Sequence, residues 1–288
     1  MKYQYFPGCS LKGTGRAYEE SFLAVFRALG IEVNELEDWN CCGATAYMSV
    51  DETKSYALAG RNLAIAERDN SDVIAPCSAC YLVLNKTMLG LKDHPELRGK
   101  VTEALKAGGL EYKGTAKVRH PLDVLANDVG LEEIKKRVKK PLAGMKFAAY
   151  YGCQVVRPFA TFDDQHNPVT MDKLIEASGA QCVDWPLKTH CCGGSLTGTV
   201  AEAGLRLAYI ILKEAKKRGA QALVTPCPLC QFNLDGYQDQ IARKFERIDI
   251  PVLYFTQVIG LAMGLSADEL GIKRGIISTK SILSAAGR

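Results

Sequence analysis

The alternation of hydrophobic and polar residues predicts strands and helices in turn along the chain. In the first half, the pattern predicts strands at 2–6, 31–36 and 72–75 and helices at 13–29 and 51–69. The second half repeats the order, with strands at 146–150, 181–185 and 222–225 and helices at 171–178 and 200–218. Strands separated by helices of this length are typical of parallel βαβ units. The chain is therefore expected to be an α/β protein.

The repeated order indicates that one domain has been duplicated. The two copies are offset by about 150 residues, and each has the size of an ordinary domain. We predict two tandem Rossmann-like domains at 1–143 and 144–272, with a boundary near Pro141–Gly144. The remaining residues, 273–288, are basic and contain Ser and Gly, so we expect a flexible surface segment there.

The cysteines repeat together with the elements. Ten of the eleven cysteines fall into two matching sets, and in both sets 34 residues separate a double cysteine from a Cys-x2-Cys motif. Two sets of soft ligands at matching spacing predict two metal centres. The first cysteine set is Cys9, Cys41, Cys42, Cys77 and Cys80, and the second cysteine set is Cys153, Cys191, Cys192, Cys227 and Cys230.

Both sets are expected at the carboxyl ends of parallel strands, where ligands bind in open α/β sheets. Cys9, Cys77, Cys153 and Cys227 each follow a predicted strand closely, and each double cysteine lies in a loop after another strand. We predict that both sites lie near the domain interface.

Composition and charge narrow the class of protein. The net charge of +4 is too small to indicate nucleic-acid binding. The N-terminus has no apolar run typical of a signal peptide, and the most apolar stretch, 252–265, is too short to span a membrane. A cysteine-rich chain without such a signal is expected in the reducing cytoplasm, where thiols bind metals.

The spacing favours an iron-sulfur cluster over zinc. Structural zinc sites use four ligands and often two Cys-x2-Cys motifs, and a pair of neighbouring cysteines fits one tetrahedral ion poorly. A cluster of several irons distributes its ligands over more than one metal atom. A regular [4Fe-4S] cubane takes four thiolates, so the fifth cysteine is either a functional thiol or a ligand of an unusual cluster. The spacing leaves both alternatives open.

The motifs resemble those of one known family. The repeated cysteine pattern, the opening Tyr5-Phe-Pro-Gly-Cys-Ser10 segment and the block Cys227-Pro-Leu-Cys-Gln-Phe-Asn-Leu-Asp235 are similar to the tandem CCG domains of the heterodisulfide reductase B subunit. The resemblance covers essentially the whole chain. It implies that each cysteine set holds a noncubane [4Fe-4S] cluster and that the two clusters cleave a disulfide of small thiols. It also implies partner subunits: one that carries cubane [4Fe-4S] clusters and a flavoprotein.

A second function remains open beside this one. CCG domains also occur in electron-transfer subunits of lactate-, glycolate- and succinate-oxidising complexes. Those versions often carry a fused ferredoxin-like segment, which this sequence lacks. The sequence does not identify the disulfide substrate, the direction of the reaction or the oligomeric state.

Several residues outside the two sets are candidates for auxiliary roles. His190 precedes the second double cysteine, at the position that Asn40 occupies in the first copy, and Arg157 and His166 lie in a longer loop at 154–168. These three are auxiliary catalytic candidates. A longer loop beside a cluster is a natural place for substrate selection or proton supply, and His190 could tune the cluster potential through a hydrogen bond to sulfur. Cys182 lies outside both sets, and we expect a buried structural thiol there.

Overall fold

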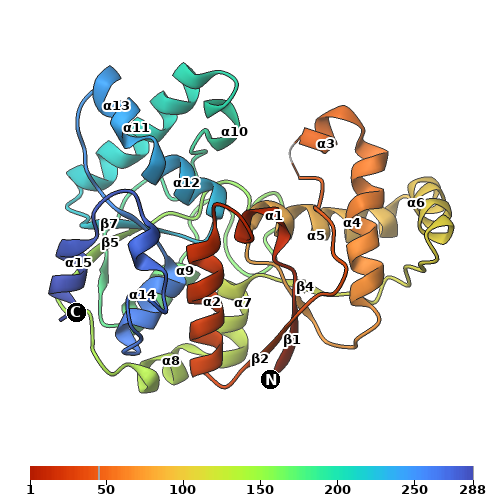
Figure 1. The fold of residues 1–288 in the computed structure, drawn as a ribbon, viewed down its shortest axis with the longest axis horizontal. Coiled ribbons are helices and arrows are strands. Elements are labelled where there is room, and N and C mark those ends of the chain that lie inside the picture. The colour runs from red at the N-terminus through yellow and green to blue at the C-terminus, as the bar shows by residue number, and fades with distance from the viewer. Residues whose placement is uncertain (45, 288) are drawn as a thin grey trace. The chain divides into compact units, whose positions relative to one another are not determined.

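The computed structural model describes residues 1–44 and 46–287, which group by their contacts into two units. Unit 1 comprises Met1–Cys9 and Gly30–Pro121, and unit 2 comprises Ser10–Leu29 and Leu122–Arg288. Each unit contains one four-stranded parallel sheet, in the order β2-β1-β3-β4 in unit 1 and β6-β5-β7-β8 in unit 2. The predicted α/β class with two similar halves is therefore confirmed (Figure 1).

The sheet of unit 1 is formed by β1 (Lys2–Tyr5), β2 (Glu32–Glu35), β3 (Val73–Ile74) and β4 (Val118–Arg119). Its helices are α3 (Ala46–Val50), α4 (Glu52–Ala66), α5 (Ser78–Asp93) and α6 (Pro95–Ala107), and the short helices α1 (Gly8–Leu11) and α7 (Pro121–Asp123) lie where the chain passes from one unit to the other. Local signals explain the helix starts. The Asp51 carboxylate accepts a hydrogen bond from Lys54 N at 3.0 Å, and Pro95 opens α6.

The sheet of unit 2 is formed by β5 (Lys146–Ala149), β6 (Gln181–Cys182), β7 (Ala222–Thr225) and β8 (Val252–Tyr254). Helices α11 (Ala201–Lys217), α12 (Pro228–Gly236) and α13 (Gln238–Lys244) lie on one side of it, and α9 (Thr170–Ala177) and α14 (Phe255–Ala262) lie on the other (Figure 1). Its other helical segments are the π-helical η1 (Val124–Val129), α8 (Leu131–Arg137), α10 (Gly194–Thr197), the 3-10 turn η2 (Ile272–Arg274) and α15 (Lys280–Ala285).

Helix α2 (Arg16–Ala28) connects β1 to β2 in the sequence, yet it packs against α14 in unit 2. The Tyr18 ring stacks on Tyr254 with centroids 4.5 Å apart, and Ser21 Oγ and Thr256 Oγ1 share a hydrogen bond of 2.6 Å. The contact-based units therefore differ from the boundaries 1–143 and 144–272, which describe the duplicated sequence and stay a prediction.

The predicted elements match the structure where the hydrophobic pattern is regular. Predicted strand 222–225 coincides with β7, whereas predicted strand 181–185 ends early, at Cys182. The sequence analysis missed β8, α14 and the helices after each Cys-x2-Cys motif, because their uniformly apolar or mixed patterns lack a clear period. The C-terminal segment also differs from the expectation of a flexible surface segment: it contains α15, whose Ile282 is buried, and the Asp235 carboxylate accepts from Ile276 N at 2.6 Å.

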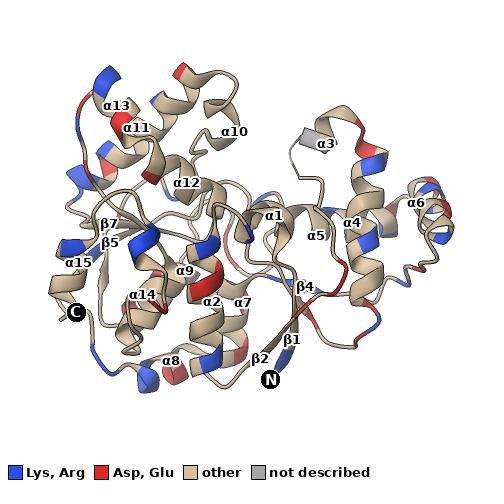
Figure 2. Ribbon diagram, in the orientation of Figure 1, with Lys and Arg blue, Asp and Glu red and all other residues tan. Residues whose placement is uncertain are grey.

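Charged residues of both signs are interleaved on the outer helices, for example on α6, whereas β5 and β7 are almost free of charge (Figure 2). This distribution is that of ordinary solvated helices. Among the described residues, no helix has the length and apolar character that crossing a membrane would require.

Two candidate cysteine centres

The fold brings the members of the first cysteine set to the carboxyl ends of β1 and β3. Cys9 lies in α1 just after β1, and Cys77 precedes α5, which begins where β3 has ended. Cys42 Sγ lies 3.3 Å from Cys80 Sγ, so the double cysteine and the Cys-x2-Cys motif meet. Cys42, Cys77 and Cys80 are buried, while Cys9 and Cys41 are exposed. The set therefore has a buried side and a side open to solvent.

Hydrogen bonds among these thiols make two of them acidic. Hydrogen bonds with Cys41 and Cys80, helped by the backbone N–H of Ala44, lower the pKa of Cys42 to about 4. The pKa of Cys77 is lowered chiefly by its bond with Cys80. In return, the pKa values of Cys41 and Cys80 are raised by their hydrogen bonds with the neighbouring thiols and by burial. The thiolate is the form of cysteine that binds metal, and in the first set Cys42 and Cys77 favour that form.

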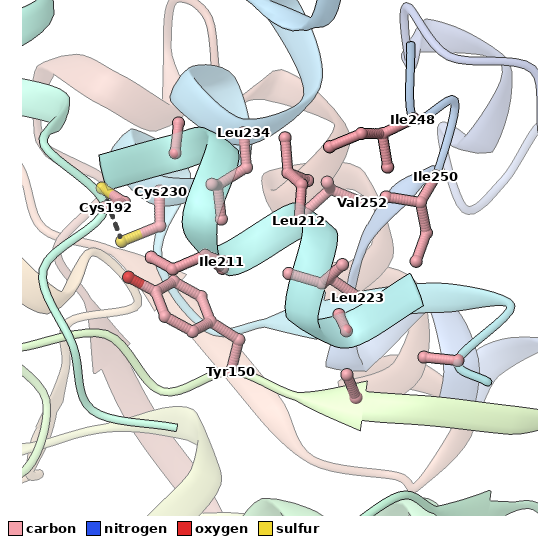
Figure 3. Packing of buried hydrophobic residues seen from close by; sticks show 14 of the residues in the cluster. Tyr150, Cys192, Ile211, Leu212, Leu223, Cys230, Leu234, Ile248, Ile250 and Val252 are labelled. Carbon is pink, nitrogen blue, oxygen red and sulfur yellow. Dashed lines mark hydrogen bonds between the residues drawn. The ribbon is translucent and has the colours of Figure 1, made fainter. Parts of the chain in front are cut away.

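The second cysteine set has the same arrangement at the ends of β5 and β7. Cys192 Sγ lies 3.5 Å from Cys230 Sγ, and both are buried (Figure 3). Cys191 is exposed, as Cys41 is, whereas Cys153 is only partly exposed. The backbone N–H groups of Gly193 and Gly194 donate to the sulfurs of Cys191 and Cys192 at 3.4 and 3.3 Å. Backbone donors thus support negative charge on both sulfurs of this pair.

In the second set, as in the first, two thiols have lowered pKa values and two have raised ones. A hydrogen bond from Cys153, the Gly193 N–H and the nearby Arg157 guanidinium lower the pKa of Cys191 to about 6. The pKa of Cys192 is lowered mainly by its bond with Cys230. The pKa values of Cys153 and Cys230 are raised in turn.

A glycine at the same place in each set lets the backbone pass close to a sulfur. Gly8 and Gly152 have left-handed φ angles of 62° and 70°. A Cβ at Gly8 would lie 2.9 Å from Cys80 Sγ, and one at Gly152 would lie 3.0 Å from Cys230 Sγ. Side chains are therefore excluded here on two grounds, the backbone conformation and the space that the sulfur occupies.

The donor chemistry fits an iron-sulfur cluster. Both sets consist of thiols alone, the ligands typical of iron-sulfur clusters. Within the described part of the chain, no three His, Cys, Asp or Glu side chains are placed to share a single metal ion. The two cysteine sets would hold the clusters. Because Gly8 and Gly152 have no side chain, nothing crowds the sulfurs of Cys80 and Cys230 there.

The three auxiliary candidates differ in their placement. Arg157 lies beside the second set, where it donates to the Thr189 carbonyl and lowers the pKa of Cys191. His190 is adjacent in sequence, but its side chain is exposed. His166 is exposed in the 154–168 loop, where Asp164 accepts from its backbone N–H at 2.8 Å. In the described residues, neither imidazole has a hydrogen bond to a cysteine sulfur, and catalytic roles for all three stay predictions.

Cys182 and His120 lie outside the two cysteine sets and contact backbone carbonyls. Cys182 ends β6, is partly exposed, and its Sγ lies 3.8 Å from the Asp172 carbonyl oxygen, while burial raises the pKa of its thiol. His120 is fully buried, with Nε2 at 3.1 Å from the Pro76 carbonyl oxygen next to Cys77. The expectation of a fully buried thiol at Cys182 thus holds only in part.

The sequence analysis missed a buried polar network beside the second set. Lys188 Nζ lies 2.8 Å from Asp172 Oδ1, and Tyr151 donates to Asp172 Oδ2 at 2.7 Å. The Lys188 carbonyl accepts from the N–H groups of Tyr151 and Gly152, directly before Cys153. This network ties the loop before Cys191 to the strand end that carries Cys153. Neither spacing nor periodicity could indicate it, because its members are distant in sequence and lie on different elements.

Comparison with known proteins identifies the family and the fold of the chain. The cysteine-rich CCG domain family matches residues 3–85 and 147–235, which include both cysteine sets. The fold and site thus define a tandem CCG-domain protein. A crystal structure of a hypothetical protein from Helicobacter pylori has the same fold, with a TM-score of 0.78 over 96% of this chain at 14% identity. The chain spans about half (52%) of that protein.

Relatives that align with this chain over nearly their whole length identify the family more closely. The B subunit of the Ferredoxin/F(420)H(2)-dependent CoB-CoM heterodisulfide reductase of Methanosarcina acetivorans is 34% identical over 98% of this chain and 96% of its own length. A protein of Archaeoglobus profundus, named for its likeness to the heterodisulfide reductase B subunit, is 34% identical over 94% of this chain and 93% of its own. The 8-methylmenaquinol:fumarate reductase membrane anchor subunit of Wolinella succinogenes is 36% identical over 98% and 99%. The chain belongs to the family of the heterodisulfide reductase B subunit.

Proposed function

We propose that this chain is the catalytic iron-sulfur subunit of a heterodisulfide reductase-like complex. The observation that carries the proposal is the complete doubled ligand set: all five cysteines are present in each half, and in both halves the second cysteine of the double cysteine lies beside the second cysteine of the Cys-x2-Cys motif. Full-length relatives named as the B subunit of heterodisulfide reductases support the same function. Two noncubane [4Fe-4S] clusters, one on each cysteine set, are the cofactors that we infer.

The reaction would consume one disulfide, two electrons and two protons and would release two thiols. When bound, an iron-sulfur cluster supplies or accepts electrons one at a time, so two clusters suit a two-electron step. Each half has a thiol that favours the thiolate form, since Cys42 and Cys191 have lowered pKa values. Arg157 places a positive charge beside Cys191. The exposed Cys191 and Cys41 leave each set accessible to a small substrate.

Electrons would come from partner subunits. We infer one companion that carries cubane [4Fe-4S] clusters and a flavoprotein beyond it, as the resemblance to the heterodisulfide reductase B subunit implies. All eleven cysteines are free thiols, which supports a reducing, cytoplasmic location.

The experiment uses anaerobically purified chain. Iron and sulfide analysis should give two clusters per chain, and Cys42→Ala and Cys192→Ala should each remove about half of the iron. Cys182→Ala is the matched control and should keep all of it. Iron content of one cluster or none in the unsubstituted chain would contradict the proposal.

A second measurement separates catalysis from electron transfer. The oxidised chain is titrated with coenzyme M and with coenzyme B, the thiols in the name of the M. acetivorans relative, and followed by electron paramagnetic resonance. A new signal that broadens with ³³S-labelled thiol would support binding of the substrate sulfur. A chain that shows no thiol-dependent signal but is oxidised by a quinone would instead be an electron-transfer subunit, as in quinol-linked complexes such as that of the W. succinogenes relative.

A further inference from the structure

The residue that precedes each double cysteine is held by a buried side chain, and the two halves use different side chains to do so. These residues are Asn40 in the first half and His190 in the second. Each directly precedes two ligands of its set. The direction in which the loop leaves this residue therefore determines where the two following sulfurs lie.

In the first half, the side chain that holds the loop comes from helix α4. Asn62 is 2% exposed, and its Nδ2 donates to the Asn40 carbonyl at 3.0 Å. Its Oδ1 accepts from Asn40 N at 2.9 Å. One amide side chain thus satisfies both backbone groups of Asn40.

In the second half, the side chain comes from the end of strand β5. Tyr150 is fully buried, and its hydroxyl donates to the His190 carbonyl at 2.6 Å. The backbone N–H of His190 is satisfied separately, by the Leu187 carbonyl at 3.3 Å. Figure 3 shows the hydroxyl end of Tyr150 pointing toward Cys192 and Cys230.

The aligned repeat shows that each half lacks the donor that the other uses. Two residues before the conserved glycine, Phe6 stands where the second half has Tyr150. Twenty residues after the double cysteine, Leu212 stands where the first half has Asn62. Phe6 and Leu212 are both fully buried. The donor lies on helix α4 in the first half and at the end of strand β5 in the second, whereas the acceptor is the same backbone carbonyl in both.

The two aromatic rings occupy corresponding places. A Cβ at Gly8 would lie 3.3 Å from Phe6 Cε1, and one at Gly152 would lie 3.9 Å from both Cε1 and Oη of Tyr150. A hydroxyl added to Phe6 would therefore start from a comparable position. An interior position tolerates a polar side chain only when it is hydrogen-bonded, so the exchange of donors is constrained by the need to pair each one.

We propose that Asn62 and Tyr150 are positioning residues for Cys41-Cys42 and Cys191-Cys192, and that they are two interchangeable solutions to one requirement. The requirement is a buried donor to the carbonyl directly before the double cysteine. The effect of this hydrogen bond on a bound cluster rests on the proposed function, because the bond would determine how tightly the two following cysteines retain iron.

The test transplants each solution into the other half. Tyr150→Phe reproduces the first-half ring in the second half, and adding Leu212→Asn supplies the first-half donor. Asn62→Leu followed by Phe6→Tyr does the reverse. Phe6→Tyr and Leu212→Asn alone are the matched controls. The readout is the rate of iron release to a ferrous chelator under anaerobic conditions, together with the electron paramagnetic resonance spectrum of the oxidised chain.

We expect Tyr150→Phe and Asn62→Leu each to accelerate release of about half of the iron, by roughly tenfold, as is typical when a residue supporting a metal ligand is removed. The spectrum of one cluster should change and that of the other should not. The added donors should restore both quantities. The controls alone bury a second donor beside a carbonyl that is already paired, so they should lower the free energy of unfolding and should not slow iron release below that of the unsubstituted chain.

Three outcomes would overturn the inference: unchanged iron release in both single variants, equal acceleration of all the iron, or a failure of both transplanted donors to restore it. If a single variant does not fold, recovery of folding in the corresponding double variant supports the inference, and no recovery in either half contradicts it. An unsubstituted chain that binds no iron would instead contradict the proposed function, so the two failures are distinguishable.

Discussion

The two cysteine sets share their sulfurs and differ in what surrounds them. In both, the double cysteine meets the Cys-x2-Cys motif, at 3.3 Å in the first set and 3.5 Å in the second. The second set is supported by a buried ion pair, Lys188–Asp172, and by the 154–168 loop that brings Arg157. The first set has Asn62 as its polar support and exposes Cys9 to solvent.

This difference separates what the ligands require from what the chain is free to vary. The 34-residue spacing from the double cysteine to the Cys-x2-Cys motif is the same in both halves, as is the glycine before the first cysteine, whose backbone passes close to a sulfur. The hydrogen-bonding supports have diverged, since several side chains can hold a loop equally well. We therefore expect two chemically similar centres of unequal stability.

The largest expected effect comes from breaking the buried pair beside the second set. Asp172→Asn leaves Lys188 without its counter-charge. The effect is large because both side chains are only about a tenth exposed. Loss of one partner of a buried pair costs about 3–5 kcal/mol of the free energy of unfolding. Chemical denaturation measures it. The matched control is Asp69→Asn, which removes the partner of Lys2 in an exposed pair and should have no measurable effect. Equal losses of stability in Asp172→Asn and Asp69→Asn would contradict the view that the buried ion pair supports the second set more strongly than an exposed pair would.

A smaller effect, equal in both halves, is expected from the shared glycines. Gly8→Ala and Gly152→Ala force alanine into left-handed backbone, which costs about 1–2 kcal/mol, and push Cβ toward Cys80 or Cys230. Each variant should also lose iron from its own half, as measured by iron per folded chain. Gly30→Ala is the control, because it has φ 73° but its Cβ would meet nothing within 4 Å. It should lower stability without loss of iron. A large difference between Gly8→Ala and Gly152→Ala would show that the two sets do not constrain the backbone alike.

The smallest effect is expected at Cys182, the cysteine that only the second half has. Its thiol is partly exposed and is separate from the hydrogen-bonded thiols of the second set. Cys182→Ala should change the free energy of unfolding by less than about 1 kcal/mol and leave iron content and the electron paramagnetic resonance spectrum unchanged. Altered spectra would assign Cys182 to the cluster environment and would widen the difference between the halves.

The cysteine sets could be predicted from the sequence because identical residues at repeated spacing are visible without a fold. The positions of Cys9, Cys77, Cys153 and Cys227 at strand ends also followed, since short apolar runs mark buried parallel strands. The supports could not be predicted in the same way. Tyr150 and His190 are 40 residues apart, and only the folded chain brings them together.

The divergence between the halves was nonetheless present in the sequence. Aligning the copies places Phe6 opposite Tyr150 and Asn62 opposite Leu212, but two separate differences do not reveal that one compensates for the other. The packing of α2 is a similar case. Its apolar face predicts burial, and nothing in its sequence identifies α14 as the partner.

The packing of α2 on α14 also sets an order of events on the ribosome. The buried face of α2, which includes Tyr18, Phe22 and Phe26, is synthesised early, whereas α14 begins only at Phe255. At roughly 5–20 residues per second, translation separates the two helices by a time on the order of tens of seconds. During that interval the nascent chain carries an aromatic surface with its final partner still unmade, so chaperone access during synthesis is expected to matter more for this protein than for one whose halves fold in sequence.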